Sequence, residues 1–413
     1  MPTTNQASRA RRALTRPLRR ALVRALPSRP FALRFWDGSV VPATSRDAPE
    51  FHARSPAALA HFLRAPGELG LGRAYAAGDL VVDDLDAAFS VVEDWEPPAI
   101  GVPDRIRLML GAALAAGASG LPKIPSLELI LEGERHSVAR DAAAVRYHYD
   151  VGNDFFALFL DPSMTYSCAI FSRGAQTLEE AQATKLALVA TKLGLKPGQR
   201  VLDVGCGWGS FAIHAATQHD VSVVGITLST EQAALARTRV ADAGVADRVE
   251  IRVADYRELA DAPFDAISSI GMVEHVGDAQ IDRYTSTLAR LLVPGGRLLN
   301  HGIAQLDPDE DPSADLFSNR YVFPDGEPLP LSRVLLSMER AGLRTTHVEG
   351  FMDDYARTLT EWTRRLDERL DEAERLAGAD RTRIWRLYLR AARRGFEVGF
   401  TSVYQVLAHR PPA

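Results

Sequence analysis

Cysteine is nearly absent from this 413-residue sequence, which contains two, Cys168 and Cys206. Two cysteines in separate motif-like segments exclude a disulfide framework and favour a reducing, cytoplasmic compartment. Long apolar runs are also missing. The longest candidate, residues 108–121, is rich in Gly and Ala and falls short of the roughly 18 apolar residues of a membrane-spanning helix. The net charge of −5 gives no reason to expect a nucleic acid partner. The sequence therefore predicts a protein that neither crosses a bilayer nor binds nucleic acid.

Acidic residues are missing from the first 36 positions, which contain nine arginines. Leu14, Leu18, Leu22 and Leu26 recur there at every fourth residue, as on one face of a helix. Such a cationic amphipathic helix predicts contact with an anionic membrane surface, with leucines in the headgroup region and arginines on phosphates. A solvated, partly disordered tail is the alternative interpretation. Because arginines interrupt every apolar run, the segment is not a secretory signal.

Two domains are expected, because the chain exceeds a typical single core and its motifs begin well after the N-terminus. Residues 120–125 contain two prolines and a glycine, which resist continuation of a helix or strand, so this segment is interpreted as a linker. The expected division is a smaller N-terminal domain over residues 1–130 and a catalytic domain over residues 131–413. No catalytic constellation occurs in the first.

The most informative stretch is an apolar strand over residues 201–204 that runs into a glycine-rich turn. Gly205, Gly207 and Gly209 form this turn, and a helix begins near Phe211. Glycines between a strand and a helix let backbone approach a ligand, so the stretch is interpreted as a cofactor site. Tight turns use the same residues, and a glycine triplet alone is weak support. The strands that follow strengthen the interpretation as a cofactor site.

The second and third strands end in side chains that discriminate between cofactors. Residues 221–229 end in hydroxyls rather than in the carboxylate that binds the ribose of NAD. Residues 249–253 lead to Asp255 and Tyr256, an acid and an aromatic that suit an adenine. This pattern disfavours NAD and favours S-adenosylmethionine.

Further strands over residues 264–270 and 297–301 predict a mainly parallel α/β sheet of Rossmann-like type. Glu274 and His301 follow these two strands, so both belong to the carboxyl edge of the sheet, where α/β proteins bind ligands. An acid and an imidazole beside a cofactor site raise the odds of catalysis over a structural role. The polar and aromatic residues 145–168 precede the first strand and are interpreted as a lid over this edge.

Seven blocks in this order resemble the cyclopropane-fatty-acyl-phospholipid synthase family, which includes the mycolic acid cyclopropane synthases. The blocks are His148-Tyr-Asp-Val-Gly-Asn, Met164-Thr-Tyr-Ser-Cys168, Val204-Gly-Cys-Gly-Trp-Gly209, Gly225-Ile-Thr-Leu-Ser-Thr-Glu-Gln232, Glu274-His-Val-Gly, Tyr321-Val-Phe-Pro-Asp-Gly and Tyr355-Ala-Arg-Thr-Leu. The resemblance implies a class I S-adenosylmethionine-dependent methyltransferase with a mainly parallel seven-stranded sheet. Only the phospholipid enzymes carry an extra N-terminal domain, as this chain does, which favours an unsaturated membrane phospholipid as substrate.

The resemblance also assigns the cofactor site. The residues expected to line the S-adenosylmethionine site are Tyr166, Ser167, Asp203, Gly205, Cys206, Gly207, Thr227, Gln232, Asp255 and Tyr256. The residue chemistry agrees, since glycines admit the methionine portion, Thr227 and Gln232 can hydrogen-bond ribose hydroxyls, and Tyr256 can cover the adenine. For Thr227 and Tyr256, the alternative is that they merely end strands.

The implied reaction transfers a methyl group to one carbon of a cis double bond and leaves a carbocation on the other. Loss of a proton from the new methyl group then closes a cyclopropane ring. The family is thought to use a bound bicarbonate ion as the base. By resemblance, the ion is held by the side chains of Glu274, His301 and Tyr355 and by the backbone at Cys168 and Ile303. No metal is implied.

Three other functions stay open. A methylene or methyl-branched acyl chain would result if the same carbocation lost a different proton. Methylation of a soluble small molecule is disfavoured by the basic N-terminus and the extra domain. A non-catalytic lipid-binding protein could keep the fold, since fold does not fix function. The expected location is the cytoplasm, at the inner face of the cell membrane, with a homodimer formed through the N-terminal domain as a further family-based expectation.

The C-terminal third is expected to complete the sheet. Arg-rich helices are predicted over residues 358–376 and 383–394, followed by a strand over residues 402–406. Their arginines fit a solvated helix face as well as a phosphate site, so no site residue is assigned there.

Overall fold

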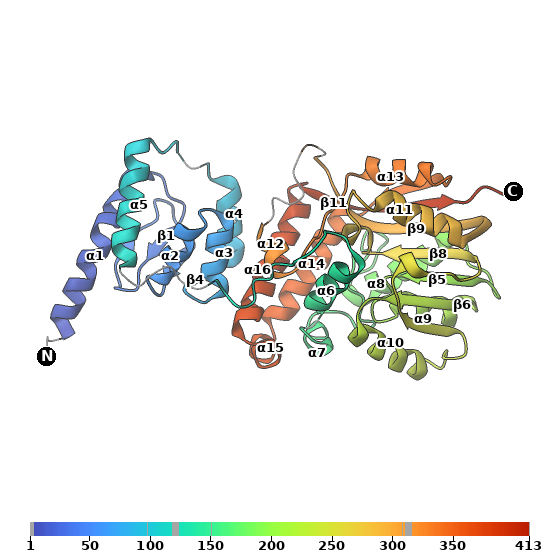
Figure 1. Ribbon diagram of the computed structural model, residues 1–413. Coiled ribbons are helices and arrows are strands. Elements are labelled where there is room, and N and C mark those ends of the chain that lie inside the picture. The colour runs from blue at the N-terminus through green and yellow to red at the C-terminus, as the bar shows by residue number, and fades with distance from the viewer. Residues whose placement is uncertain are drawn as a thin grey trace. The chain divides into compact units, whose positions relative to one another are not determined.

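The computed structural model describes residues 4–96, 98–117, 124–149, 151–307, 309 and 316–412 (Figure 1). The chain divides into two compact units, Met1–Leu129 with Gly378–Ala391, and Ile130–Ala377 with Ala392–Ala413. The return of residues 378–391 to the first unit has no counterpart in the sequence patterns. Most of the expected linker, residues 118–123, lies outside the described residues.

The first unit, called the N-terminal unit below, combines a small sheet with helices. Its strands are β1 (Ala32–Arg34), β2 (Val40–Val41), β3 (Glu50–Ala53) and β4 (Leu80–Val82), in the order β2-β1-β3-β4. Its helices are α1 (Thr4–Ala25), α2 (Ala57–Arg64), α3 (Glu68–Ala76), α4 (Leu85–Asp94) and α5 (Val102–Ala116). Figure 1 shows α1 and α5 side by side.

The predicted N-terminal helix is present as α1, but its leucine row faces the protein. Leu18 is 3% exposed and Leu22 is partly buried, and both pack in the core of the N-terminal unit with Phe35. A Cβ atom at Gly111 of α5 would lie 2.8 Å from Leu18 Cα, so glycine permits the close approach of the two helices. The expectation that this leucine row enters a lipid surface is therefore wrong for Leu18. Only Leu14, 50% exposed, remains on the surface.

The second unit, called the catalytic unit below, is built on a seven-stranded sheet in the order β10-β11-β9-β8-β5-β6-β7. The strands are β5 (Arg200–Val204), β6 (Ser222–Thr227), β7 (Val249–Val253), β8 (Phe264–Ile270), β9 (Leu292–Gln305), β10 (Arg344–Gly350) and β11 (Thr401–His409). Strands β9, β8, β5, β6 and β7 are parallel, whereas β11 and β10 are antiparallel to their neighbours. The predicted mainly parallel α/β sheet is confirmed.

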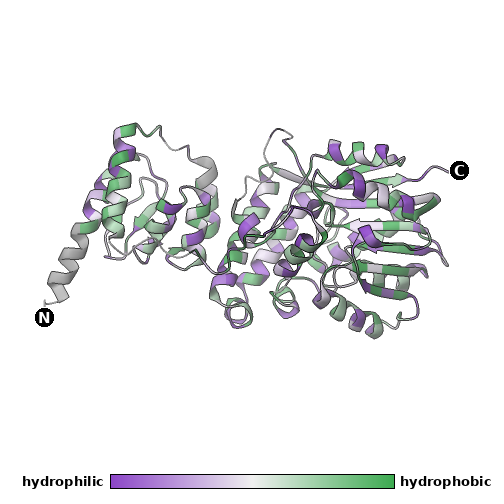
Figure 2. Ribbon diagram, viewed as in Figure 1, coloured by the Kyte–Doolittle hydropathy of each residue, from purple (hydrophilic) through white to green (hydrophobic). Residues whose placement is uncertain are grey.

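Alternating side chains of the strands supply the two faces of this sheet. Val201 packs with helices α8 (Leu178–Leu193), α9 (Ser210–His219) and α10 (Thr230–Asp242). Its neighbour Leu202 packs on the other face, with α11 (Ile281–Leu291) and α13 (Leu331–Arg340). Because both faces are covered, the strands are apolar runs rather than half-polar stripes, and Figure 2 shows hydrophobic stretches along the central strands.

The catalytic unit has further helices, which come before β5 or after β9 in the chain. They are α6 (Val138–Tyr149), α7 (Asn153–Phe156), α12 (Leu316–Tyr321), α14 (Met352–Asp367) and α15 (Leu370–Ala377), with α16 (Ala379–Glu397) shared between the units. The single helix predicted over residues 358–376 is thus wrong, because α14 ends at Asp367 and α15 begins at Leu370. In the described part of the chain no helix is long and apolar enough to cross a membrane.

Candidate active site

The turn after β5 requires glycine. Gly205, Gly207 and Gly209 have φ angles of +75°, +54° and +81°, in the left-handed region that side chains with a Cβ rarely adopt. The amides of Gly205 and Cys206 donate to the carbonyl of Ile226, at 3.0 and 2.9 Å, and tie the turn to β6. The chain therefore leaves the sheet with backbone, rather than side chains, facing the space above it.

A cavity opens above this turn, at the carboxyl ends of β5 to β8. All ten residues expected at the S-adenosylmethionine site line it, namely Tyr166, Ser167, Asp203, Gly205, Cys206, Gly207, Thr227, Gln232, Asp255 and Tyr256. The lining residues that sequence reasoning did not assign to this site include Tyr149, Lys185, Trp208, Met272 and His275. Tyr149, Trp208 and His275 stand inside three of the seven motif blocks, which was the available signal for them.

Two polar side chains on and after β6 face each other. Thr227 Oγ1 donates to Gln232 Oε1 at 2.7 Å, so the amide nitrogen of Gln232 keeps its hydrogens for a ligand or a neighbour. Ser229 caps α10 by accepting from the Gln232 amide at 3.2 Å, which fixes Gln232 in the first turn of the helix. A ribose hydroxyl is a suitable partner for such a donor and acceptor pair.

The acid after β7 is held by an arginine. Arg257 donates from Nε to Asp255 Oδ1 at 2.8 Å and from Nη2 to Asp255 Oδ2 at 2.6 Å, and Nη2 also donates to Asp141 Oδ2 at 2.9 Å. Tyr256 is buried, and its ring meets that of Tyr284 edge to face at 5.3 Å. Asp255 and Tyr256 are thus held in place where they line the cavity.

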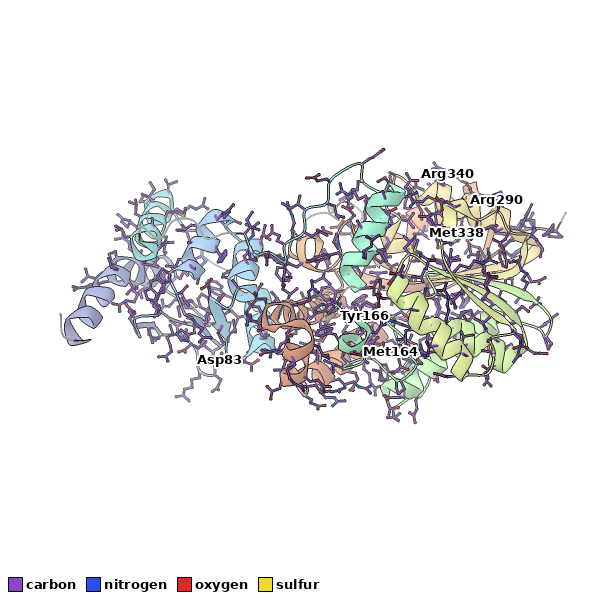
Figure 3. All side chains as sticks on the ribbon, turned by 60° about the horizontal axis from the view of Figure 1, so that its bottom comes forward. Asp83, Met164, Tyr166, Arg290, Met338 and Arg340 are labelled. Atoms are coloured by element: carbon purple, nitrogen blue, oxygen red, sulfur yellow. The ribbon has the colours of Figure 1, made fainter. Side chains whose placement is uncertain are left out.

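The segment predicted as a lid, residues 145–168, contributes directly to the cavity. Gln182 Nε2 donates to the carbonyls of Thr165, at 3.2 Å, and Ser167, at 2.9 Å, and Lys185 Nζ donates to Ser167 Oγ at 2.8 Å. The Tyr166 ring lies 5.2 Å from the Trp362 ring and is stacked on it; Tyr166 is labelled in Figure 3. Burial lowers the pKa of Lys185 to about 8. Contacts with α8 and α14 therefore fix this segment beside the cofactor cavity.

Glu274 lies in a short 3₁₀ turn after β8, Val273–His275, and reaches over β9. Its Oε1 accepts from the Ile303 amide at 2.8 Å. A Cβ at Gly302 would lie 2.2 Å from a methyl of Val273, so glycine lets the turn approach the strand. Glu274 Oε2 is buried and has no hydrogen-bond partner among the described residues. Burial raises the pKa of Glu274 to about 7, which suits a group that exchanges a proton near neutrality.

His301 stands on β9, directly opposite Gln405 of β11. Gln405 Nε2 contacts His301 Nδ1 at 3.0 Å, while His301 Nε2 is buried with no partner in the described chain. Burial, together with the positive charges of Lys185 and Lys192, lowers the pKa of His301 well below its usual value. The imidazole is therefore neutral at physiological pH.

Cys168 and Tyr355 are brought together through α14. The carboxylate of Asp354 accepts from the amide of Phe171 at 2.6 Å, and Thr358 Oγ1 accepts from the amide of Ala169 at 3.0 Å. These bonds hold the segment after Cys168 against the first turns of α14, next to Tyr355. The Tyr355 ring packs 4.6 Å from the ring of Phe396 and 6.1 Å from that of Trp362.

Phe351 links Cys168 to His301, although sequence reasoning did not select it. Its carbonyl lies 3.7 Å from Cys168 Sγ, its amide donates to the Val403 carbonyl at 2.9 Å, and its ring is parallel to that of His301 at 6.3 Å. Phe351 therefore connects the surroundings of Cys168 and His301, and none of the residues expected to hold an anion lines the cofactor cavity.

A small anion fits this second group of residues in most respects. Glu274 Oε2 and His301 Nε2 are buried polar atoms without partners, and within the described residues no atom accepts from the Cys168 amide. One detail differs from the expectation, because the Ile303 amide already donates to Glu274. Ile303 therefore positions the carboxylate in this structure.

Cys168 is predicted to be dispensable as a thiol. Burial raises the pKa of Cys168 well above its usual value, so the thiolate needed for nucleophilic attack is not formed. Its Sγ donates to the Ala169 carbonyl at 3.2 Å, which a hydroxyl can also do. Cys168→Ser should retain at least about half of the wild-type turnover, since the side chain acts as a small buried group. A covalent adduct on Cys168 accumulating during turnover would overturn this prediction.

A doubly covered, mainly parallel sheet, a glycine-rich turn after β5 and the pair Asp255–Tyr256 after β7 are the features of a Rossmann-like fold that binds S-adenosylmethionine, and the comparisons show that the protein is an S-adenosylmethionine-dependent methyltransferase. Comparison of the chain with known protein families identifies which methyltransferase family it belongs to. Residues 136–406 match the model of the mycolic acid cyclopropane synthetase family, and the chain belongs to that family.

Similar proteins agree with this assignment. A probable fatty acid methyltransferase of Mycobacterium tuberculosis is 39% identical over 86% of this chain and 85% of its own length. The cyclopropane-fatty-acyl-phospholipid synthase of Escherichia coli is 36% identical over 83% of this chain and 84% of its own. A crystal structure of a mycolic acid cyclopropane synthase complexed with S-adenosylhomocysteine matches with a TM-score of 0.62 and 35% identity, over 65% of this chain and 98% of that one. The chain is thus an enzyme of the cyclopropane fatty acid synthase type.

Proposed function

We propose that this enzyme adds the methyl group of S-adenosylmethionine to the cis double bond of an unsaturated phospholipid acyl chain and forms a cyclopropane ring. The observation that carries the proposal is the buried pair Glu274, in the turn after β8, and His301, on the neighbouring strand β9, each with a polar atom that has no partner among the described residues. The similarity to the Escherichia coli phospholipid enzyme over 83% of this chain supports the substrate class, because it reaches into the N-terminal unit.

The chain's residues would bind the cofactor and keep its surroundings dry. S-adenosylmethionine supplies an electrophilic methyl group when bound. Thr227 and Gln232 would hold the ribose, and Tyr256 would cover the adenine. An alkene is a weak nucleophile, so exclusion of water and alignment must supply much of the rate, while the aromatic faces of Tyr166 and Trp362 can stabilise positive charge nearby.

We further propose that Glu274, His301, Tyr355 and the Cys168 amide hold a bicarbonate ion, which supplies the base when bound. Glu274, with its pKa raised to about 7, can take up a proton at physiological pH. The amide of Ile303 fixes the orientation of this carboxylate at 2.8 Å. His301 is neutral and can donate one hydrogen bond without adding a charge.

The fate of the transferred methyl group can be tested with deuterium, by counting how many deuterium atoms the new carbon retains. With S-adenosylmethionine carrying a CD₃ group and vesicles of cis-monounsaturated phospholipid, the lipid should gain one carbon that retains two deuterium atoms, because the new methyl group loses one. Three retained deuterium atoms would show either a methyl branch whose carbocation lost a proton from the acyl chain or methylation of a heteroatom, and both results would contradict the proposal. If the protein binds S-adenosylmethionine but leaves the lipid unchanged, the result would favour the alternative of a non-catalytic lipid-binding protein.

A methylene-bearing acyl chain is the second candidate product. The relative with 39% identity is described only as a probable fatty acid methyltransferase, which does not specify a ring. The methylene product forms when a hydride shifts from the methylated carbon to the neighbouring cation and a proton then leaves the new methyl group, so it retains two deuterium atoms, as the ring does. The products are isomers and are told apart by their protons rather than by mass.

For the membrane partner we propose α5 of the N-terminal unit rather than α1. Five large apolar side chains of α5 are between 47% and 69% exposed, Val102, Ile106, Met109, Leu110 and Leu114, and their spacing places them on one face of the helix. Exposed arginines flank this face at Arg105 and Arg107. An apolar helix face with a basic rim suits the surface of an anionic bilayer. The enzyme would then be a peripheral protein at the inner face of the cell membrane.

Replacing Ile106 and Leu110 together by serine should weaken binding to anionic phospholipid vesicles by about 100-fold or more, since each buried aliphatic side chain contributes about 1.5–3 kcal/mol. Cosedimentation with vesicles measures this. The matched control is Leu336→Ser on α13, an aliphatic side chain of the catalytic unit that is 42% exposed. Unchanged vesicle binding would contradict the assignment, and a changed oligomeric mass instead would make α5 a self-association surface.

A further inference from the structure

A line of polar side chains leads from Lys192 of α8, through Gln405 of β11, to His301 of β9. Lys192 Nζ lies 2.7 Å from Gln405 Oε1, and Gln405 Nε2 lies 3.0 Å from His301 Nδ1. Gln405 is fully buried and His301 is 1% exposed, so water does not compete for these contacts. Gln405 and His301 face each other in the register of β9 and β11.

The chemistry of the three groups fixes the position of each hydrogen. The Lys192 ammonium can only donate, so the amide atom facing it must be the Gln405 oxygen. The NH₂ group of Gln405 therefore faces His301 and donates to Nδ1. A neutral imidazole that accepts at Nδ1 carries its own hydrogen on Nε2.

We propose that Lys192 and Gln405 are positioning residues, which hold His301 as the Nε2–H tautomer and so present a hydrogen-bond donor to the anion beside Glu274. The catalytic meaning of this chain of contacts, called the Lys192 relay below, rests on the proposed function. The tautomer itself is a property of the free protein. Without the relay, the unpaired imidazole would populate both tautomers, and one of them presents a lone pair where the anion needs a donor.

The outer end of the Lys192 relay is anchored. Glu349 of β10 accepts from Lys192 Nζ at 2.6 Å and also contacts Arg173 and His347. Burial lowers the pKa of Lys192, and the Glu349 carboxylate opposes this and favours the charged ammonium. The helix that carries Lys192, α8, begins with a capping box between Thr177 and Glu180. Both ends of the Lys192 side chain are therefore held.

The direct test is the ¹⁵N spectrum of the full-length protein labelled at the histidine rings, recorded without lipid or bicarbonate. The His301 signals are assigned by their absence in His301→Asn. We expect a protonated Nε2 and an unprotonated, hydrogen-bonded Nδ1. A wild-type His301 protonated at Nδ1 would overturn the proposal, whatever reaction the enzyme performs, because this measurement does not depend on turnover.

Lys192→Met tests the cause of the tautomer. The variant should show a mixture of both His301 tautomers, and its kcat should fall by about tenfold, as for other functional histidines whose outer partner is removed, with an unchanged KM for S-adenosylmethionine. The matched control is Lys196→Met, the same substitution at an exposed lysine four residues later. An unchanged tautomer in Lys192→Met would overturn the proposal, even if kcat falls, since that loss would then be structural. If Lys192→Met fails to fold, Gln405→Leu provides the same readout.

Discussion

Glu274→Gln should lose about 10²- to 10⁴-fold in turnover, the range expected when a positioned proton acceptor is removed, while its affinity for S-adenosylmethionine stays close to wild type. The carboxylate is buried beside β9, accepts from Ile303 and does not line the cofactor cavity. Glutamine keeps the size and the acceptor of this side chain but cannot take up a proton. Single-turnover kinetics and equilibrium binding of S-adenosylmethionine measure the two effects separately.

The matched control is Glu327→Gln. The Glu327 amide donates to the Glu274 carbonyl at 2.8 Å, but its side chain pairs with His136, so it belongs to the same region without facing the proposed anion. Turnover of this control should stay within a small factor of wild type. An equal loss of cofactor affinity in Glu274→Gln would instead place Glu274 in the cofactor site.

The same substitution has a second consequence, which depends on pH. Burial raises the pKa of Glu274 from 4.5 to about 7, so the folded protein holds this proton more tightly than the unfolded chain does. Stability is therefore lost as the pH rises from about 4.5 to about 7. Glu274→Gln lacks this proton and should be more stable than wild type at pH 8, by an amount on the order of 3 kcal/mol. Urea unfolding should show no such difference at pH 4.5.

Gly207→Val should weaken the binding of S-adenosylmethionine by about 100-fold or more, because a side chain would both strain the turn and occupy the cavity. The φ angle of Gly207 is +54°, and the nearest atom to a Cβ there is Gln232 Nε2 at 4.0 Å, so the added methyl groups would stand in the space beside the amide assigned to the ribose. Calorimetric titration with S-adenosylmethionine measures the loss.

Gly198→Val is the matched control for Gly207→Val. Gly198 precedes β5, has a φ of +80°, and a Cβ there would meet no atom within 4 Å. Backbone strain is thus comparable in the two variants, whereas only Gly207 lines the cavity. Equal losses of affinity in both variants would show that strain, rather than occupation of the cavity, causes the effect, and would contradict the assignment of the site.

The cofactor site could be predicted from the sequence because its determinants are local. Gly205 and Gly207 form a turn whose backbone angles exclude other residues, and Asp255 and Tyr256 directly follow an apolar strand. Parallel strands bring their carboxyl ends to one edge, which places the residues that follow β5, β6 and β7 in one cavity. Tyr166 and Ser167 precede the sheet, and only the family resemblance assigned them to this site.

Other features could not be predicted, for physical reasons. Strand β10 is mostly exposed, so it has no apolar alternation to mark it. The leucine row of α1 shows that one face is buried, but not whether protein or lipid covers it. The contact between Lys192 and Gln405 joins residues 213 positions apart, and only the pairing of β9 with β11 brings the amide to His301.

The central claim is tested most directly by the ¹H NMR spectrum of fatty acids released from cis-monounsaturated phospholipid vesicles after incubation with the enzyme and S-adenosylmethionine. The account predicts high-field protons of a cyclopropane ring, formed by the wild type and absent with Glu274→Gln. Exocyclic methylene protons would show that the carbocation gives a methylene-bearing acyl chain, and would contradict the proposal that a cyclopropane ring forms. An unchanged lipid under conditions where S-adenosylmethionine binds would contradict the proposed reaction as a whole.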